Sequence, residues 1–384
     1  MKKFNRELDL SGFNNSAFLF GPRMTGKSTL LRRLDSKAYF DLLDPKAELL
    51  YSARPEIFWQ EVSALPIGSL VVVDEIQRVP QLLNYVQMGI DRMQHIFLLS
   101  GSSARKLRRG GANLLGGRAL DFRLHSLSRR EIGDKFCLSD ALSYGTLPKI
   151  SVLITEKKYD LVRELLFSYV TTYIKEEIQA EAITRKIGSF QRFIAIAAQN
   201  NAQTIEFSNI SRECSVPAST VKEYYQILDD TLIGFLLWPF DHSERKKSRP
   251  KAYFFDCGLI RALQNRLLDP PTPQETGFLF ETWLINEFIK IRDYSRKHHE
   301  LSFWRERDHE VDLLVCSGNK PILAVECKSG NDDLKPGTIK RFRECFPDTR
   351  LVVASMTAER KRLYNDIEVL PWTEVLEIYE QLKV

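Results

Sequence analysis

The chain of 384 residues is long enough for two or three domains, and its 43% hydrophobic and 27% charged residues are ordinary for a globular protein with buried cores. The net charge of +5 permits a polyanionic partner without requiring one. No run of 18 apolar residues occurs and the N-terminus lacks a hydrophobic signal segment, so we expect a cytosolic protein with no membrane span. The six scattered cysteines lack metal-ligand spacing, and we expect them to be small buried side chains in a reducing compartment.

Residues 21–28 match the phosphate-loop pattern GxxxxGK[ST] at every fixed position. The apolar run Ala17–Phe20 before the loop predicts a buried strand, and Ser28–Leu34 after it predicts the start of a helix. Backbone N–H groups at such a helix start can cradle phosphate oxygens, while Lys27 reaches the β- and γ-phosphates and the Ser28 hydroxyl holds Mg²⁺. The sequence therefore predicts an ATP or GTP site formed by Gly21, Pro22, Arg23, Met24, Thr25, Gly26, Lys27, Ser28 and Thr29.

The second half of a nucleotide site follows farther along the chain. An apolar strand over residues 70–74 ends in Asp74, and Glu75 comes next. We expect Asp74 to position the metal ion and Glu75 to orient or activate the attacking water.

The order of elements predicts an α/β fold with several segments. Short strands over 17–20, 38–41, 70–74, 96–100 and 120–124 alternate with helical patterns, which indicates a mostly parallel sheet. We expect a phosphate-loop ATPase domain over 1–128 and a helical lid or connector over 129–200, with an amphipathic helix at 159–178.

Residues 201–268 have the pattern of a winged helix-turn-helix. Helices are predicted over 207–214 and 218–229, with wing strands over 232–240 and 251–255. The second helix exposes few basic residues, so packing against a neighbouring domain is as good an interpretation as reading a DNA groove. The segment Arg245–Lys251 at the wing tip is the better candidate for a phosphate-binding surface, and the runs Arg105–Arg109, 129–130 and 290–297 are also basic.

A proline-rich spacer, Asp269–Pro273, is expected to mark a boundary before a C-terminal domain over 274–384. There we predict a hairpin whose returning strand starts at Ile322, because Pro321 has no N–H to donate. Pairing Cys316 with Ile322 places Asp312 opposite Glu326, with Cβ atoms about 5 Å apart.

Charged groups within apolar strands need partners or a metal ion, because an unpaired buried charge costs several kcal/mol. We expect Asp312 and Glu326 to hold one Mg²⁺, Glu281 to complete its ligands, and Lys328 to orient or activate a water. The alternative is an ordinary ion pair between Glu326 and Lys328 on an exposed edge strand.

The chain resembles the bacterial and archaeal ATP-binding proteins that combine an AAA+ type ATPase domain with a C-terminal DUF4143 region. The residues that carry the resemblance span nearly the whole sequence. They are Gly21–Ser28, Val73–Pro80, Leu99–Ser103, Leu115–Arg118, Tyr144–Pro148, Tyr253–Leu259, Phe280–Glu281, His309–Asp312 and Val325–Gly330.

The resemblance implies an ATPase, a winged-helix middle domain and a C-terminal restriction-endonuclease-like fold of the PD-(D/E)XK type. It also implies that Ser100 senses the γ-phosphate and that Arg118 is an arginine finger, either in its own site or in that of a neighbouring subunit. Action in a neighbouring subunit would require a homo-oligomer.

Three functions are consistent with these features. The first is an enzyme that couples ATP turnover to binding and metal-dependent processing of nucleic acid, with DNA favoured. The second is a nucleotide-controlled switch or binding module whose nuclease-like domain does not cleave, since a fold alone does not prove an activity. The third is a remodeller of protein substrates.

Overall fold

The computed structural model describes residues 4–10, 12, 14–102, 115–174, 187–240, 249–330, 334–364 and 366–382. Three sequence predictions fall wholly or partly outside these ranges: the basic run Arg105–Arg109, residues 245–248 of the segment Arg245–Lys251, and residues 175–178 of the helix predicted over 159–178. The chain divides into two compact units. The first contains residues 1–127, 147–149 and 227–233, and the second contains residues 128–146, 150–226 and 234–384.

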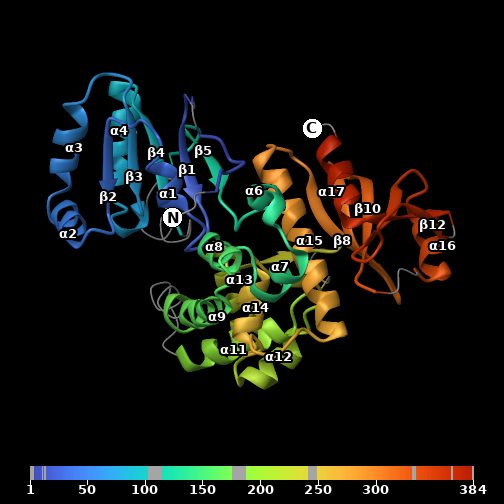
Figure 1. Cartoon of the computed structure of the whole chain (residues 1–384). Coiled ribbons are helices and arrows are strands. Elements are labelled where there is room, and N and C mark those ends of the chain that lie inside the picture. Colours follow the sequence, from blue (N-terminus) through green and yellow to red (C-terminus); the bar gives the residue numbers. More distant parts are fainter. Residues whose placement is uncertain are drawn as a thin grey trace. The chain divides into compact units, whose positions relative to one another are not determined.

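The first unit is built on a five-stranded sheet in the order β2-β3-β4-β1-β5 (Figure 1). Its strands are β1 (Ser16–Phe20), β2 (Ala38–Asp41), β3 (Leu70–Asp74), β4 (Ile96–Gly101) and β5 (Ala119–Arg123). All of these pairings are parallel, which confirms the α/β prediction, and each strand lies within one residue of its predicted position. Helices α1 (Lys27–Leu31), α2 (Pro45–Ala53), α3 (Pro55–Ser63) and α4 (Leu82–Met93) connect the strands, with a 3₁₀ turn η1 (Ile76–Arg78).

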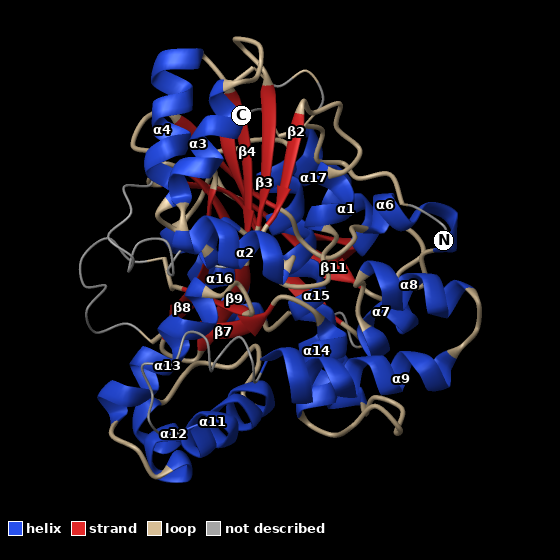
Figure 2. Cartoon of the chain, turned by 90° about the vertical axis from the view of Figure 1, so that its left-hand side faces the viewer, coloured by secondary structure: helices blue, strands red, loops and turns tan. Residues whose placement is uncertain are grey.

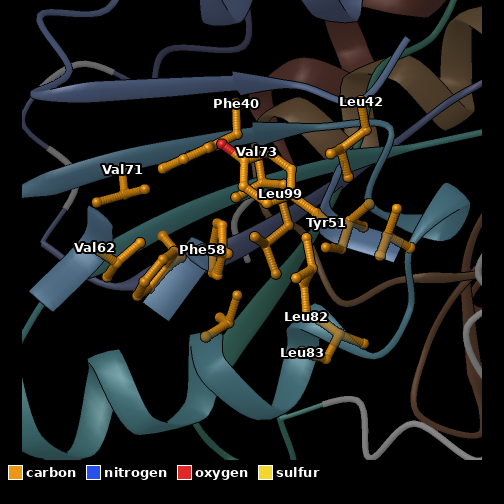
Figure 3. Packing of buried hydrophobic residues seen from close by; sticks show 14 of the residues in the cluster. Phe40, Leu42, Tyr51, Phe58, Val62, Val71, Val73, Leu82, Leu83 and Leu99 are labelled. Atoms are coloured by element: carbon orange, nitrogen blue, oxygen red, sulfur yellow. The ribbon is translucent and has the colours of Figure 1, made fainter. Parts of the chain in front are cut away.

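One face of this sheet carries the main hydrophobic core of the unit (Figure 3). Alternate strand residues such as Phe40, Val73 and Leu99 pack against Phe58 of α3 and Leu82 of α4. The intervening residues of the same strands, such as Val72 and Leu98, are equally buried. Parallel strands covered on both faces are continuously apolar, which is why these segments could be recognised in the sequence.

The middle of the chain is mainly helical, as the blue elements of Figure 2 show. Its helices are α6 (Arg129–Ile132), α7 (Leu138–Tyr144), α8 (Pro148–Thr155), α9 (Tyr159–Ser168), α11 (Ile187–Gln199), α12 (Phe207–Cys214), α13 (Ala218–Asp230) and α14 (Cys257–Leu263), with short turns η2 (Gly133–Lys135) and η3 (Tyr169–Ile174). The predicted helix over 159–178 ends as an α-helix at Ser168 and continues as the π-helical η3. Strands β6 (Gly234–Leu237) and β7 (Lys251–Phe254) pair antiparallel where wing strands were predicted, but the winged-helix assignment itself stays a prediction.

The C-terminal part contains a six-stranded sheet in the order β12-β13-β11-β10-β9-β8. The strands of this sheet are β8 (Glu300–Glu306), β9 (His309–Ser317), β10 (Lys320–Lys328), β11 (Arg350–Ser355), β12 (Arg362–Tyr364) and β13 (Ile367–Pro371). The helices of this part are α15 (Pro273–Tyr294), α16 (Pro336–Cys345) and α17 (Trp372–Gln381). The residues on both sides of the proline-rich spacer belong to the second compact unit. The four domain boundaries therefore stay predictions.

The hairpin of β9 and β10 corrects the predicted register at its turn. The returning strand starts at Lys320, and Pro321 rather than Ile322 pairs with Cys316. An irregularity between Pro321 and Leu323 then absorbs one residue, so that Leu323 pairs with Val315 as predicted. Proline is tolerated at the second pair of the hairpin because it lies directly beside this bulge, where the regular ladder is interrupted.

The cysteine prediction is only partly confirmed. All six cysteines are free, and those at positions 214, 257 and 316 are buried. Cys137 and Cys345 are exposed, so they are not the small core side chains that their scattered spacing suggested. Within the described ranges, no helix combines the length and apolar character needed to cross a membrane.

Candidate functional site

The phosphate loop connects β1 to α1 and depends on glycine at two positions. A Cβ atom added to Gly21 would lie 2.3 Å from the backbone oxygen of Leu124, so the loop can pass β5 only without a side chain there. Gly26 has φ +97°, a conformation that L side chains rarely adopt. Both fixed glycines of the motif are thus explained by the local backbone.

The side chain of Lys27 folds back onto the loop that precedes it. Its Nζ donates hydrogen bonds to the backbone oxygens of Gly21 at 2.7 Å and of Pro22 at 3.1 Å. The hydroxyl of Thr25 also donates to the Pro22 oxygen at 2.8 Å, and Nη1 of Arg6 donates to the Thr25 oxygen at 2.6 Å. These contacts hold the loop in a defined shape. Of the other predicted loop residues, Arg23, Met24 and Ser28 are half-buried and Thr29 is exposed.

The strand ends beside the loop bring together the predicted metal ligand and the predicted sensor. Strand β4 lies between β1 and β3, and Ser100 is in register with Leu19, directly before the end of β1. The Ser100 hydroxyl donates to Oδ1 of Asp74 and accepts from the backbone N–H of Glu75 at 3.0 Å. Asp74 is fully buried. The structure therefore gathers Asp74, Glu75 and Ser100 at the C-terminal ends of the parallel strands, where the phosphate loop begins.

Two residues that the sequence analysis missed hold these carboxylates. The hydroxyl of Tyr39 on β2 donates to Oδ2 of Asp74 at 2.6 Å. The side-chain amide of Gln77 donates to Oε2 of Glu75 and lies 3.3 Å from Oγ of Ser102. Glu75 itself has φ +62°, a left-handed conformation that is uncommon for glutamate and that turns the chain sharply after β3. Tyr39 lies beside β3 because β2 pairs with that strand, with Tyr39 in register with Val72, a pairing that the local sequence pattern does not specify.

Arg118 lies at the other end of the sheet. It directly precedes β5, whose first residue Ala119 pairs with Ser16 at the start of β1, whereas the phosphate loop follows the end of β1. A five-residue strand separates these ends by about 16 Å at roughly 3.3 Å per residue. Nε of Arg118 forms an ion pair with Oδ1 of Asp91 at 2.8 Å, and both side chains are exposed. The structure thus does not bring Arg118 to the phosphate loop of its own chain, and only the prediction of action in a neighbouring subunit remains.

The donors at this edge of the first unit fit a nucleotide with Mg²⁺. The first backbone N–H groups of α1 have no partner within the helix, and the ammonium of the buried Lys27 donates to the carbonyl oxygens of Gly21 and Pro22. A hydroxyl from Ser28 and a carboxylate from Asp74 are hard oxygen ligands of the type that Mg²⁺ prefers.

The second unit contains the predicted C-terminal cluster. The backbone N–H of Cys327 donates to Oδ2 of Asp312 at 2.9 Å, which places Asp312 beside the end of β10. Nζ of Lys328 donates to Oε1 of Glu326 at 2.8 Å, while Oε2 of Glu326 is buried without a hydrogen-bond partner. The alternative ion pair is therefore formed, although β10 is flanked by β9 and β11 and is not an edge strand.

A lysine that the sequence analysis assigned to the wing tip lies among these carboxylates. Lys251 is buried, and its Nζ is 2.9 Å from Oε1 of Glu281, 2.6 Å from Oε1 of Glu310 and 3.3 Å from Oδ1 of Asp312. It is therefore not part of a basic surface, which corrects that prediction. The other described basic residue of the segment is Arg249, which forms an ion pair with Glu206.

Burial and charge shift the titration of this cluster. Burial, together with the charge of Asp312, raises the pKa of Glu281 to about 7, although Lys251 and the Tyr253 hydroxyl act in the opposite direction. Burial and Asp312 likewise raise the pKa of Glu326, against the effect of Lys328. Burial lowers the pKa of Lys251, but the surrounding carboxylates outweigh it and hold that pKa well above its usual value.

The cluster does not fit the predicted metal ion. In the part of the chain that the structure describes, no group of three or more histidine, cysteine, aspartate or glutamate side chains is placed to hold one. The cation that Glu281 and Asp312 contact is the ammonium of Lys251. Beside the cluster lies a cavity of about 960 Å³, lined by Glu281, Asp312, Arg249, Arg305, Phe240 and Phe303 among others.

Comparisons with known families divide the chain into three matched regions. Residues 14–133 match an AAA domain, residues 137–269 match a domain of unknown function (DUF8612), and residues 276–375 match a domain of unknown function (DUF4143). The AAA domain and the DUF4143 region are those that the resemblance implied, and the first supports nucleotide binding and ATP hydrolysis. The restriction-endonuclease-like fold of the C-terminal region is not confirmed.

Two curated relatives extend over most of the chain. The uncharacterized proteins Mb2031c of Mycobacterium bovis and Rv2008c of Mycobacterium tuberculosis are each 26% identical over 373 residues, covering 93% of this chain and 80% of theirs. Among solved structures, the Aeropyrum pernix ORC1 protein in complex with DNA has a TM-score of 0.32 and 13% identity, covering 67% of this chain and 87% of that one. The replication initiator DnaA bound to AMPPCP and single-stranded DNA has a TM-score of 0.28 and 15% identity, covering 58% and 84%. Structural similarity at this level says nothing about what this chain binds.

Proposed function

We propose that the first unit binds ATP with Mg²⁺ and hydrolyses it. The observation that carries this proposal is the convergence of the phosphate loop, Asp74, Glu75 and Ser100 at one edge of the parallel sheet. A phosphate loop alone is a common motif, but together with an acid-tipped strand and a hydroxyl on the strand between them it has all the parts of a hydrolytic site.

Each residue has a distinct task in this proposal. Lys27 exchanges its contacts with the loop carbonyls for the phosphate charge, and the loop N–H groups orient the phosphates. Ser28 and Asp74 would hold Mg²⁺, which would supply positive charge beside the phosphate oxygens on which negative charge develops. Glu75 accepts a proton from the attacking water or orients it, and Gln77 holds the Glu75 carboxylate in place. Ser100 links the loop strand to Asp74.

Two variants test the assignment. Lys27→Ala should abolish ATP binding measured by titration calorimetry, because the phosphates lose their main cationic partner. Glu75→Gln should bind ATP with Mg²⁺ as the wild type does and release phosphate slowly, because the metal site survives while water activation is lost. Equal ATP affinity in the wild type and in Lys27→Ala would refute the site.

For the rest of the chain we propose nucleic-acid binding controlled by the nucleotide state, with DNA as the favoured ligand. The basic residues Arg105–Arg109 and Arg245–Lys247 of the sequence support a phosphate-binding surface. The run 290–297 does not, because Lys290 is buried against Glu287 and the buried Lys297 donates to the backbone oxygen of Leu382. The division into an ATPase domain, a helical connector, a winged helix and a C-terminal domain is part of this proposal. Lys251 lies among the predicted metal ligands. This position favours a binding module without cleavage activity, and it disfavours a metal-dependent nuclease.

Binding and cleavage are tested together on duplex and single-stranded DNA. Replacing Arg245, Lys246 and Lys247 by glutamine should weaken binding to all sequences and flatten its salt dependence. Unchanged affinity and salt slope would remove this segment from the interface. Cleavage of DNA with Mg²⁺ or Mn²⁺ that disappears in Asp312→Asn would establish the nuclease instead of the non-cleaving module.

A further inference from the structure

Glu281, Glu310 and Asp312 are the three carboxylates that contact Lys251, and in this subsection "the cluster" means these three without Glu326. We infer that Lys251 is the built-in cation of this cluster, and that the cluster binds no divalent metal ion while Lys251 is in place. This inference concerns the second unit, and it stands whether or not the first unit hydrolyses ATP.

The contacts of the ammonium group are those of a central cation. Nζ of Lys251 lies between 2.6 and 3.3 Å from one oxygen of each of the three carboxylates. These distances are hydrogen-bond distances, and an ammonium group has three protons to donate. The side chain of Lys251 is 4% exposed, so water does not compete for these bonds.

The backbone fixes Lys251 in this position. On one side Lys251 pairs with Leu237 in the β6–β7 ladder, and on the other it forms a bridge with Thr204. The neighbouring Tyr253, on the same face of β7, donates its hydroxyl to Oε1 of Glu281 at 2.6 Å. Lysine and tyrosine thus approach the same carboxylate oxygen from one rigid strand, and the cluster is built around them.

A divalent ion cannot share the site with this ammonium. Mg²⁺ and Mn²⁺ require oxygens at about 2.0–2.2 Å, and an ion bound to the oxygens that Lys251 contacts would lie within a few ångströms of Nζ. At such distances the repulsion between the two cations is large in a buried site. Conversely, without Lys251 the cluster would hold three carboxylates with no cation at its centre, which is strongly destabilising. The lysine therefore satisfies the same electrostatic need that a metal ion would.

The first experiment measures Mn²⁺ binding by titration calorimetry and by the electron paramagnetic resonance signal of free Mn²⁺, on the full-length, nucleotide-free protein. The wild type and Asp312→Asn should give the same weak, nonspecific binding. Lys251→Ala should bind Mn²⁺ at least tenfold more tightly. The matched control Lys328→Ala also removes a lysine from a carboxylate, but one outside the cluster, and should gain nothing. Mn²⁺ binding by the wild type that is lost in Asp312→Asn would overturn the inference, as would a folded Lys251→Ala with no gain.

The second experiment does not depend on metal binding and remains informative if Lys251→Ala does not fold. Thermal unfolding of Lys251→Met should occur roughly 10 °C below that of the wild type, because breaking a buried ion pair is costly. The double variant Lys251→Met/Glu281→Gln should recover much of this loss, because one uncompensated carboxylate is gone. Additive effects of the two substitutions would show that the lysine and the carboxylate do not compensate each other, and would overturn the inference.

Discussion

The hydroxyl of Tyr39 provides a sharp test of the nucleotide site, because the same unit contains a matched tyrosine with no role in it. Tyr39 donates to Oδ2 of Asp74 at 2.6 Å, and Tyr51 donates to Oε2 of Glu61 at 2.7 Å. Both hydrogen bonds are partly buried and end on a carboxylate. Only the first carboxylate is a proposed ligand of Mg²⁺, so removing each hydroxyl separates a general structural effect from an effect on the site.

The structure gives the expected magnitudes. A hydrogen bond to a charged group contributes about 1.5–3 kcal/mol, and partial exposure reduces this to about 1–2 kcal/mol for either tyrosine. Tyr39→Phe and Tyr51→Phe should therefore lower the melting temperature by similar amounts, roughly 2–8 °C. Loss of a partner that orients a metal ligand typically costs about 10–100-fold in metal affinity or activity. Tyr39→Phe alone should therefore raise the Mg²⁺ concentration needed for half-maximal ATP turnover by about tenfold.

The assay is phosphate release at saturating ATP over a Mg²⁺ titration, with thermal unfolding of the same preparations. If Tyr39→Phe and Tyr51→Phe show the same turnover and the same Mg²⁺ dependence, Asp74 is not positioned by Tyr39 for metal binding. The reasoning would then be refuted even if both variants are destabilised as expected.

Further predictions concern the rest of the chain. Arg118→Ala should reduce ATP turnover about 10³-fold or more with little change in ATP affinity, and mixing it with Lys27→Ala protein should restore some activity because the arginine is expected to act on a neighbouring subunit; unaltered turnover would remove it from the site. Gly258→Ala should unfold at a clearly lower denaturant concentration, since its Cβ would lie 2.1 Å from a backbone oxygen, whereas Gly277→Ala, whose Cβ has only a 3.4 Å contact, should be neutral or slightly stabilised. Burial raises the pKa of Asp256 to about 6, so the folded state binds the proton more tightly and the free energy of unfolding should fall by about 2–3 kcal/mol as the pH rises from about 4 to 6; urea unfolding of Asp256→Asn should lack this part of the pH dependence.

The sequence predicted the parts of the structure that depend on local signals. The buried strands were continuous apolar runs, and the phosphate loop had its glycines where the backbone needs them. The register that places Asp312 beside Glu326 was also predicted in its essential part, although a bulge after Pro321 was needed to produce it. The position of Arg118 could have been inferred from the parallel sheet, because a residue before β5 lies at the opposite edge from a loop that follows β1.

Lys251 could not be predicted in the same way. In the sequence it closes a run of basic residues, and the property that matters, its burial against Glu281 and Asp312, depends on contacts between segments 30 and 61 residues apart. The only local signal was that it begins the apolar strand Lys251–Phe254, where a charged residue must find a partner once the strand is buried. Tyr39 and Gln77 were missed for a similar reason, since each contacts a carboxylate on another element or across a turn.

The contacts of Lys27 have a consequence for how a nucleotide would bind. Its ammonium donates to the Gly21 and Pro22 oxygens, so the lysine and the loop satisfy each other's hydrogen bonds within the chain. A phosphate group that binds to Lys27 must replace these bonds, so the loop is expected to exchange one set of partners for another instead of folding around the nucleotide. Part of the attraction between Lys27 and the phosphates replaces bonds that already exist, so nucleotide affinity should be moderate and release fast.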